Sequence, residues 1–317
     1  MAFRRRHDLA ALVRKVWLSG DSELKAPPWS IPMTAHDLMQ LVYATFPRLE
    51  DVASFYANPP IVPPRLSLPC CGTLRTIRSL NLDADTWNSL QTCSGLRHLG
   101  IEEMEFADGR VPTVPPSLPF HLETLNITMI CGSDTGDVFL TPFLRACGPT
   151  LKCLSLGINY EDVWDLSMLP TLASLTVEMR SGEPVEEAGE TLVEWLAAIL
   201  PTCHALQHLQ IDTPDVGSRP RRTPARLLAT PEVAAVLPAT LKRIDFDMPP
   251  RKGELEAALS KNKSVQVIGM PTQVRPTSRS PAKLNAFGLI SQILPLLCAG
   301  GRLSVAGLLS PARYHGR

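Results

Sequence analysis

Several chemical signatures are missing from this 317-residue chain. It contains no GxSxG, GxxxxGK(S/T), HExxH or GxGxxG segment, the common patterns of serine hydrolases, phosphate-binding loops, zinc peptidases and dinucleotide sites. Eight cysteines are present, but no two have CxxC spacing, which excludes the usual arrangement of a zinc or redox site. We therefore expect a protein that is not an enzyme and that holds no cofactor and no metal.

The chain also lacks net charge and a long apolar run. Its 31 basic and 31 acidic side chains balance, so no whole-protein field draws it to nucleic acid or to an anionic membrane. The longest apolar stretch, Leu284–Gly301, is interrupted by polar residues and by Pro295, and it falls short of the ~20 apolar residues of a membrane-spanning helix. No apolar run follows the basic start as in a secretory signal. We expect a cytoplasmic or nuclear protein with reduced thiols.

What the chain does contain is a repeated hexad, Leu-x-x-Leu-x-Leu, with apolar residues at its first, fourth and sixth positions. Eight copies start at intervals of 19 to 35 residues, and their first residues are Ile77, Leu96, Leu122, Leu151, Leu172, Leu206, Leu241 and Val265. Two weaker copies precede them, at Val13–Leu18 and Leu49–Val52. Leucine-rich repeats have about 20–29 residues and one short strand each.

The hexads have a direct physical interpretation. Alternate residues of a strand face opposite ways, and the apolar set of one repeat is too small to be buried unless neighbouring repeats stack on it. Segments with helical spacing lie between the hexads, at Ala35–Phe46, Asp85–Cys93, Val138–Cys147, Leu192–Leu200, Glu232–Leu237 and Glu254–Leu259. The sequence predicts an α/β leucine-rich-repeat solenoid, a curved stack with parallel strands on its concave face. An ordinary α/β domain would also alternate strand and helix, but it has no reason to repeat this hexad.

Composition divides the chain into three parts. We expect irregular N-terminal repeats over residues 1–70, the regular solenoid over 71–270, and a basic Pro/Ser-rich linker with a C-terminal extension over 271–317. From Ala257 onward the chain has no Asp or Glu but eight Lys and Arg. The apolar segment 284–309 either caps the stack or is an extension that does not pack on it.

An acidic residue directly follows five of the seven clearest hexads. These residues are Asp83, Glu102, Glu178, Asp212 and Asp247. Strands in register would place them in one column at the rim of the concave face. The polar residues expected on that face include His98, Asn126, Thr176, His208 and Gln210. We predict that these ten residues bind a protein partner with a basic or extended segment. The alternative is that Asp at a strand end simply favours the following turn.

One cluster has the composition of a metal site, namely Cys203, His204 and His208. Two histidines four residues apart share a face only in a helix. Here the pattern predicts the end of a helix followed by a strand, so the two rings should diverge. We therefore expect no metal at this cluster.

The pattern resembles the leucine-rich-repeat region of fungal F-box proteins. The similarity covers residues 7–270 and includes the segments His7–Leu18, Phe46–Leu49 and Pro149–Leu156. In that family an N-terminal F-box docks on the Skp1-type adaptor of a ubiquitin ligase, and the repeats hold the substrate. Here the hexads begin almost at Met1, with no Leu/Pro-rich three-helix segment before them. The resemblance thus implies an F-box-like substrate receptor, a repeat-only relative, or a chain with a truncated start. The alternative function is a stand-alone scaffold whose basic tail, 271–317, contacts nucleic acid or membrane.

Overall fold

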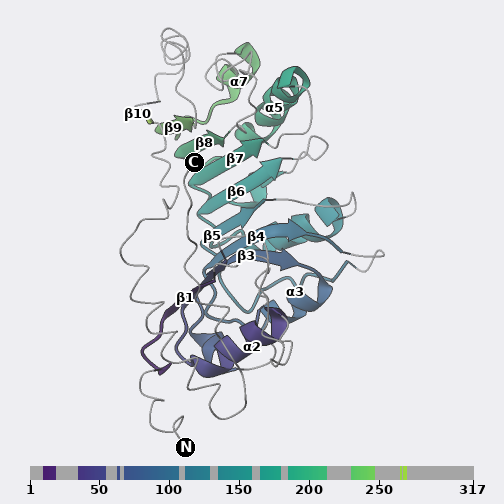
Figure 1. Ribbon diagram of the computed structural model, residues 1–317. Helices are drawn as coiled ribbons and strands as arrows, with labels where there is room; N and C mark the ends of the chain where they lie inside the picture. The colour runs from purple at the N-terminus through teal and green to yellow at the C-terminus, as the bar shows by residue number, and fades with distance from the viewer. Residues whose placement is uncertain are drawn as a thin grey trace, which may run out of the picture.

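Ten strands form one parallel sheet whose strand order follows the order of the chain (Figure 1). The computed structural model describes residues 10–18, 35–54, 63–64, 68–106, 111–128, 135–158, 165–179, 185–212, 230–246, 265 and 267–269. The strands are β1 (Lys15–Leu18), β2 (Asp51–Ser54), β3 (Thr76–Leu82), β4 (His98–Met104), β5 (Thr124–Ile127), β6 (Cys153–Ile158), β7 (Ser174–Met179), β8 (His208–Asp212), β9 (Arg243–Phe246) and β10 (Val267–Gly269). The two weak hexads of the N-terminal part therefore belong to the same sheet as the regular repeats.

The register of the sheet keeps the fourth hexad position in one column. Its members are Val16, Val52, Ile77, Leu99, Leu125, Leu154, Leu175, Leu209, Ile244 and Ile268. From Val16 to Ile244 every one of these side chains is at most 3% exposed. Each repeat therefore adds one layer to a continuous apolar core, which is how a solenoid buries side chains that a single repeat would leave in water.

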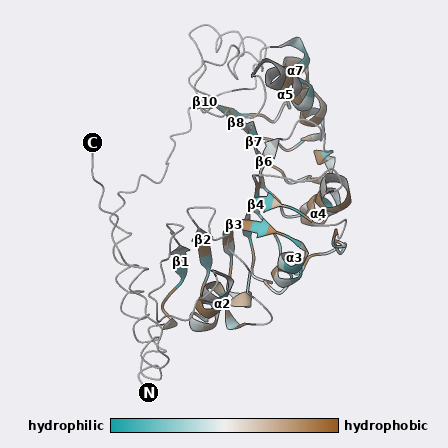
Figure 2. Ribbon diagram, turned by 45° about the vertical axis from the view of Figure 1, so that its right-hand side comes forward, coloured by the Kyte–Doolittle hydropathy of each residue, from teal (hydrophilic) through white to brown (hydrophobic). Residues whose placement is uncertain are grey.

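The described helices lie on the core side of the sheet (Figure 2). They are α2 (Ala35–Thr45), α3 (Ala84–Leu90), the π-helix η4 (Thr135–Leu140) with α4 (Thr141–Cys147), α5 (Val185–Ile199) and α7 (Pro231–Val236). Short 3-10 helices occupy the same side at η2 (Pro69–Gly72), η5 (Leu166–Met168) and η6 (Leu200–Thr202). Figure 2 shows the strands on the inside of a curve and the helices on its outside. The predicted α/β leucine-rich-repeat solenoid is confirmed.

Most of the predicted helices agree with the structure, and one begins earlier than expected. The helix predicted at Leu192–Leu200 begins at Val185, so the acidic segment before Leu192 forms its first turns. The negative charge there favours the helix N-terminus. The helix predicted at Glu254–Leu259 lies outside the described residues, as does the C-terminal part 271–317.

The hexad predicted at Ile77–Leu82 is shifted by three residues. Ile77 pairs with Leu99, so Ile77 is a fourth-position residue and the first position of its repeat is Leu74, which is fully buried. Ser79 is then an extra residue with φ 63°, and Leu80 pairs with Ile101. This β-bulge inserts one residue into the strand. The inserted residue makes Ile77-x-x-Leu80-x-Leu82 imitate the repeat in a false register.

A turn of constant form precedes the strands. In six repeats the N–H of the first hexad residue donates to the carbonyl three residues earlier; the pairs are Val13–Ala10, Leu49–Phe46, Leu96–Cys93, Leu172–Leu169, Leu206–Cys203 and Leu241–Pro238. Cys93 and Cys203 therefore lie at this turn, and both are at most 2% exposed. The described cysteines are free thiols.

A ladder of threonines links successive repeats through the same turns. Each threonine stands directly before a first-position residue, and its hydroxyl donates to the carbonyl of the first-position residue in the preceding repeat. The four bonds are Thr73–Leu49 (3.0 Å), Thr150–Leu122 (2.8 Å), Thr171–Leu151 (2.8 Å) and Thr240–Leu206 (2.7 Å). The side chain thus adds one hydrogen bond to the backbone ladder at four of the repeat interfaces.

We expect Thr150→Val to lower the free energy of unfolding by about 1 kcal/mol, because valine keeps the volume but leaves the Leu122 carbonyl without this donor. Urea denaturation followed by circular dichroism measures the change. The matched control is Thr113→Val, at an exposed threonine of the connection between β4 and β5, with an expected effect below about 0.5 kcal/mol. Equal losses in the two variants would show that the Thr150 hydroxyl contributes nothing specific.

Four aromatic rings form the centre of the core around α3 and α4. Trp87 is fully buried, and its ring meets Phe139 and Phe143 edge to face, with centroids 5.0 and 5.5 Å away. Phe106 lies against Phe139 at 4.7 Å. These residues come from three successive repeats, and they join the repeats through helix packing as well as through the sheet.

Candidate partner-binding surface

The third and fifth hexad positions lie on the sheet face opposite the core, because alternate strand residues point to opposite faces. On β7, β8 and β9 the third positions are Ser174, His208 and Arg243, and the fifth positions are Thr176, Gln210 and Asp245. We call these six residues, with Asp212 at the end of β8, the β7–β9 patch. The patch is polar throughout, whereas the opposite face of the same strands is apolar.

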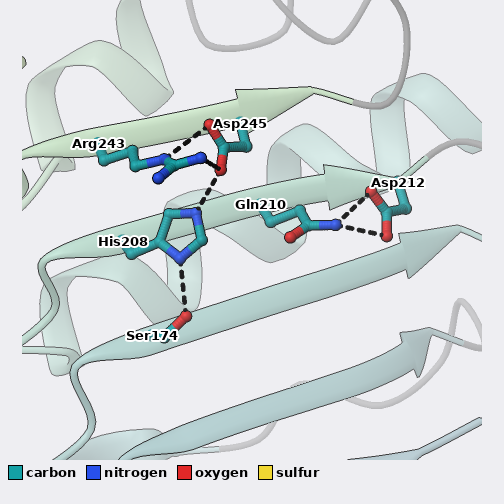
Figure 3. A network of polar contacts seen from close by, with 6 residues as sticks. All are labelled: Ser174, His208, Gln210, Asp212, Arg243 and Asp245. Carbon is teal, nitrogen blue, oxygen red and sulfur yellow. Dashed lines mark hydrogen bonds and ion pairs between the residues drawn. The ribbon is translucent and has the colours of Figure 1, made fainter. Parts of the chain in front are cut away.

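A continuous chain of polar contacts crosses the patch (Figure 3). Ser174 Oγ lies 2.9 Å from His208 Nδ1, and His208 Nε2 lies 2.8 Å from Asp245 Oδ2. Arg243 donates to both carboxylate oxygens of Asp245, from Nε at 2.9 Å and from Nη2 at 2.7 Å. The Asp245 side chain is only 3% exposed, while those of Arg243 and His208 are 50% and 27% exposed. Three strands are thus joined by side chains on their exposed face.

The carboxylate of Asp245 fixes where the protons lie. A carboxylate only accepts hydrogen bonds, so His208 Nε2 carries a proton, and in the neutral ring Nδ1 accepts from the Ser174 hydroxyl. Burial acts to raise the pKa of Asp245, but hydrogen bonds from Arg243 and His208 outweigh it, and the pKa falls below its ordinary value. Asp245 is therefore a buried anion whose charge is balanced by Arg243.

Ser174, His208 and Asp245 have the composition of a hydrolytic triad, but their surroundings differ from those of one. Serine proteases use Nε2 for serine and Nδ1 for aspartate, the reverse of the contacts here. Acyl transfer also needs converging N–H donors for the oxyanion. The N–H groups of Ser174 and His208 both donate within the sheet, to the carbonyls of Lys152 and Ala173. The contact chain therefore orders the side chains of this face.

Two acidic residues lie side by side at the C-terminal ends of β7 and β8. Glu178 pairs in register with Asp212, and Gly157 on β6 adds no side chain beside them. Both oxygens of Asp212 accept from the Gln210 amide nitrogen at 2.9 Å. Burial raises the pKa of Asp212 above its ordinary value; the Gln210 bond opposes this, and the charge of Asp245 adds to it. A cation at this edge would favour the charged form of Asp212, which burial disfavours.

The structure brings together five of the ten predicted concave residues. Thr176, Glu178, His208, Gln210 and Asp212 lie in or beside the β7–β9 patch. His98 and Asn126 occupy third and fifth positions farther along the same face, and both are exposed. Asp247 lies outside the described residues. His208 was expected in an ordinary exposed position like that of His98, but it is half-buried and bonded on both ring nitrogens.

Asp83 is an exception to the predicted column, whereas Glu102, which follows Ile101, keeps the register toward β5, where Ile101 pairs with Ile127. The prediction that Asp83 follows its hexad in register is wrong, because the bulge at Ser79 shifts that strand. Asp83 is instead the N-cap of α3, where its carboxylate accepts from the Thr86 N–H at 2.7 Å. Toward β3, Glu102 falls between two register pairs and shifts the register there. Ile101 pairs with Leu80, and Glu103 pairs with Asn81.

Sequence reasoning missed Ser174, Arg243 and Asp245 as site residues. Asp245 lies inside its hexad, one position after Ile244, whereas the predicted acidic column consists of the residues that follow the hexads. The available signal was the column of fifth-position residues. In that column the carboxylate of Asp245 stands diagonally across from His208 of the preceding repeat.

The described part of the chain also bears on a metal site and on a membrane-spanning helix. There, no three His, Cys, Asp or Glu side chains come together as a metal site requires. Cys203, His204 and His208 fall at a turn and on a strand, as expected. No described helix is both long enough and apolar enough to cross a bilayer.

Strand order, register and an open concave face define this chain as a leucine-rich-repeat solenoid, a class that typically binds partners on extended concave surfaces. A crystal structure of an internalin (inlF) from Listeria monocytogenes str. 4b F2365 is similar over 86% of each chain, with a TM-score of 0.32 and 12% sequence identity. No protein-family model and no curated protein matches the chain.

Proposed function

We propose that this protein is a non-catalytic receptor that holds an extended, basic segment of a partner protein against its concave face. The observation that carries the proposal is the polar, partly exposed β7–β9 patch beside two register-paired carboxylates. A segment lying across the strands would meet one third-position and one fifth-position side chain from each repeat. Such a face supplies hydrogen-bond donors and acceptors at a regular spacing along the solenoid.

The two edges of the concave face carry opposite charge, which gives the bound segment a direction. The second hexad position directly precedes each strand and supplies the basic edge, which consists of Arg14, Arg75, Arg97, Lys152 and Lys242. Glu50 and Glu123 on the same edge are paired with Arg14 and Lys152 at 2.9 and 3.1 Å. The opposite, acidic edge consists of Glu102, Glu105, Glu178 and Asp212. Basic side chains of the partner would face the acidic edge, where charge steers encounter and sets orientation.

We further propose that the partner is a substrate for ubiquitination and that the protein is an F-box-like receptor or a repeat-only relative of one. The support is the resemblance of residues 7–270 to the repeat region of fungal F-box proteins. A Skp1-type adaptor is the additional partner that this proposal requires. A scaffold whose basic tail, 271–317, contacts nucleic acid or membrane is the second candidate, and the absence of acidic residues beyond Glu256 favours it.

The test is affinity purification of the tagged full chain from its host cells, with mass spectrometry of the bound proteins. We expect Glu178→Lys/Asp212→Lys to recover roughly tenfold less partner, since two charges are reversed at the acidic edge. The matched control is Glu194→Lys/Glu232→Lys, the same charge change at exposed positions of α5 and α7. The control should recover the partner as the wild type does.

Each outcome of this experiment decides between the proposals. An adaptor and a cullin among the bound proteins would support a ligase receptor, and a partner without them would support a repeat-only receptor. Full recovery by the acidic-edge variant would contradict the concave-face proposal. Binding of RNA or liposomes that is lost on removal of residues 271–317 would favour the scaffold.

A further inference from the structure

Three cysteines from two consecutive repeats gather at one turn of the solenoid. Cys70 and Cys71 belong to η2, directly before the repeat that contains β3, and Cys93 lies in the turn before β4. All three are at most 5% exposed. Thr92 completes the group, with its hydroxyl oxygen 3.6 Å from Cys71 Sγ. The concave-face proposal uses none of these residues.

Repeat geometry places two of the thiols opposite each other. Cys71 stands three residues before the first-position Leu74, and Cys93 stands three residues before the first-position Leu96, so both lie the same number of residues ahead of two paired strands, β3 and β4. Stacked repeats lie about 4.8 Å apart, and a disulfide needs Cα atoms about 4.4–6.8 Å apart. The two turns pack closely, since a Cβ added to Gly95 would lie 2.5 Å from the Gly72 carbonyl oxygen.

The surroundings of the two thiols shift their pKa values in opposite directions. The Cys93 thiol donates a hydrogen bond to Cys71, and this bond lowers the pKa of Cys71 to about 6, although burial acts against it; Thr92 donates as well. The same bond, followed by burial, raises the pKa of Cys93 well above its ordinary value. These directions favour the thiolate at Cys71 and the protonated thiol at Cys93, as in an attacking and a resolving cysteine.

We propose that Cys71 and Cys93 form a redox-modification site at which a peroxide joins two consecutive repeats by a disulfide. The Cys71 thiolate attacks one peroxide oxygen and the O–O bond breaks, so Cys71 becomes a sulfenic acid. The hydroxide that leaves takes up the proton that the Cys71 thiol had released to solvent and becomes the first water. The Cys93 sulfur then attacks the Cys71 sulfur, the S–O bond breaks, and the Cys93 proton leaves with the hydroxyl group as the second water. Two thiols and one hydrogen peroxide thus give one disulfide and two waters.

The disulfide has a mechanical consequence for the solenoid. It closes a loop of about one repeat and ties the N-terminal strands to the rest of the sheet, because β1 and β2 reach β4 only through β3. Cross-linking a loop of this length restricts the unfolded chain. We expect oxidation to raise the melting temperature by about 5 °C.

The full chain is treated with hydrogen peroxide, alkylated without reduction and digested with trypsin. Cys70 and Cys71 share the peptide 66–75, and Cys93 lies in the peptide 79–97, so the expected product is these two peptides joined by a disulfide. Cys93→Ser should abolish the joined product, whereas Cys70→Ser should retain it. Cys147→Ser, at a buried thiol of α4, is the matched control and should also retain it.

The wild-type digest decides the matter even where a variant fails to fold. A Cys70–Cys71 disulfide within peptide 66–75 would overturn the proposal, as would oxidation of Cys71 beyond the sulfenic acid while Cys93 stays alkylated. Joined peptides in the Cys70→Ser variant together with an unchanged melting temperature would overturn the stabilising role.

Discussion

Trp87→Ala is expected to lower the free energy of unfolding by about 4 kcal/mol, the range for removing a large buried aromatic side chain. The indole fills the space between α3 and α4, and two phenylalanine rings contact it edge to face. Alanine would leave a cavity that three repeats surround, since the rings come from different repeats. Urea denaturation at equilibrium, with the slope of the transition compared with that of the wild type, measures the loss.

Trp87→Phe separates the cavity from the chemistry of the indole. Among the described residues the Trp87 Nε1 donor has no hydrogen-bond partner, and the buried Tyr43 hydroxyl has none either. Removing an unpaired buried polar group offsets part of the lost packing, so we expect Trp87→Phe to cost less than about 2 kcal/mol and Tyr43→Phe to be close to neutral. A loss in Trp87→Phe as large as that in Trp87→Ala would contradict this account and indicate a bonded indole.

Asp245→Ala is expected to lower the free energy of unfolding by about 3 kcal/mol, because it removes the buried member of a charged pair and leaves His208 without its Nε2 partner. Arg243 is half-exposed and can be solvated, which keeps the loss at the lower end of the range for broken pairs. Arg243→Gln, at the exposed member of the same pair, should cost clearly less than Asp245→Ala, because solvent screens the exposed charge. A loss in Arg243→Gln equal to that in Asp245→Ala would contradict the assignment of Asp245 as the centre of the network.

The same network predicts how the difference changes with pH. The pKa of Asp245 lies below its ordinary value of 3.8, so its contribution is complete above that value and is lost as the pH falls through the lowered one. The stability gap between the wild type and Asp245→Asn should therefore be constant at neutral pH and shrink in acid. A gap that widens on acidification would contradict the direction of the pKa.

The sequence was sufficient for the architecture because the hexad is a local pattern. Leu99 with Ile101, or Leu154 with Leu156, already specifies a strand with one buried face, and repetition specifies the stack. The false register at Ile77 shows the limit of this local pattern, because the sequence does not reveal that the inserted Ser79 has a positive φ. The polar network was beyond a local reading, because Ser174, His208 and Asp245 are 34 and 37 residues apart and meet only through strand register.

The sequential order of the ten strands also determines how this chain can assemble. Each strand pairs only with the strands next to it along the chain, so the sequence separation of the pairing contacts stays near one repeat however long the sheet becomes. Low separation of this kind shortens the search for native contacts. Any adjacent pair of repeats can act as a nucleus, from which order spreads toward both ends. Repeats in the middle, with two neighbours each, are then the last to open, and the terminal strands exchange their amide hydrogens first.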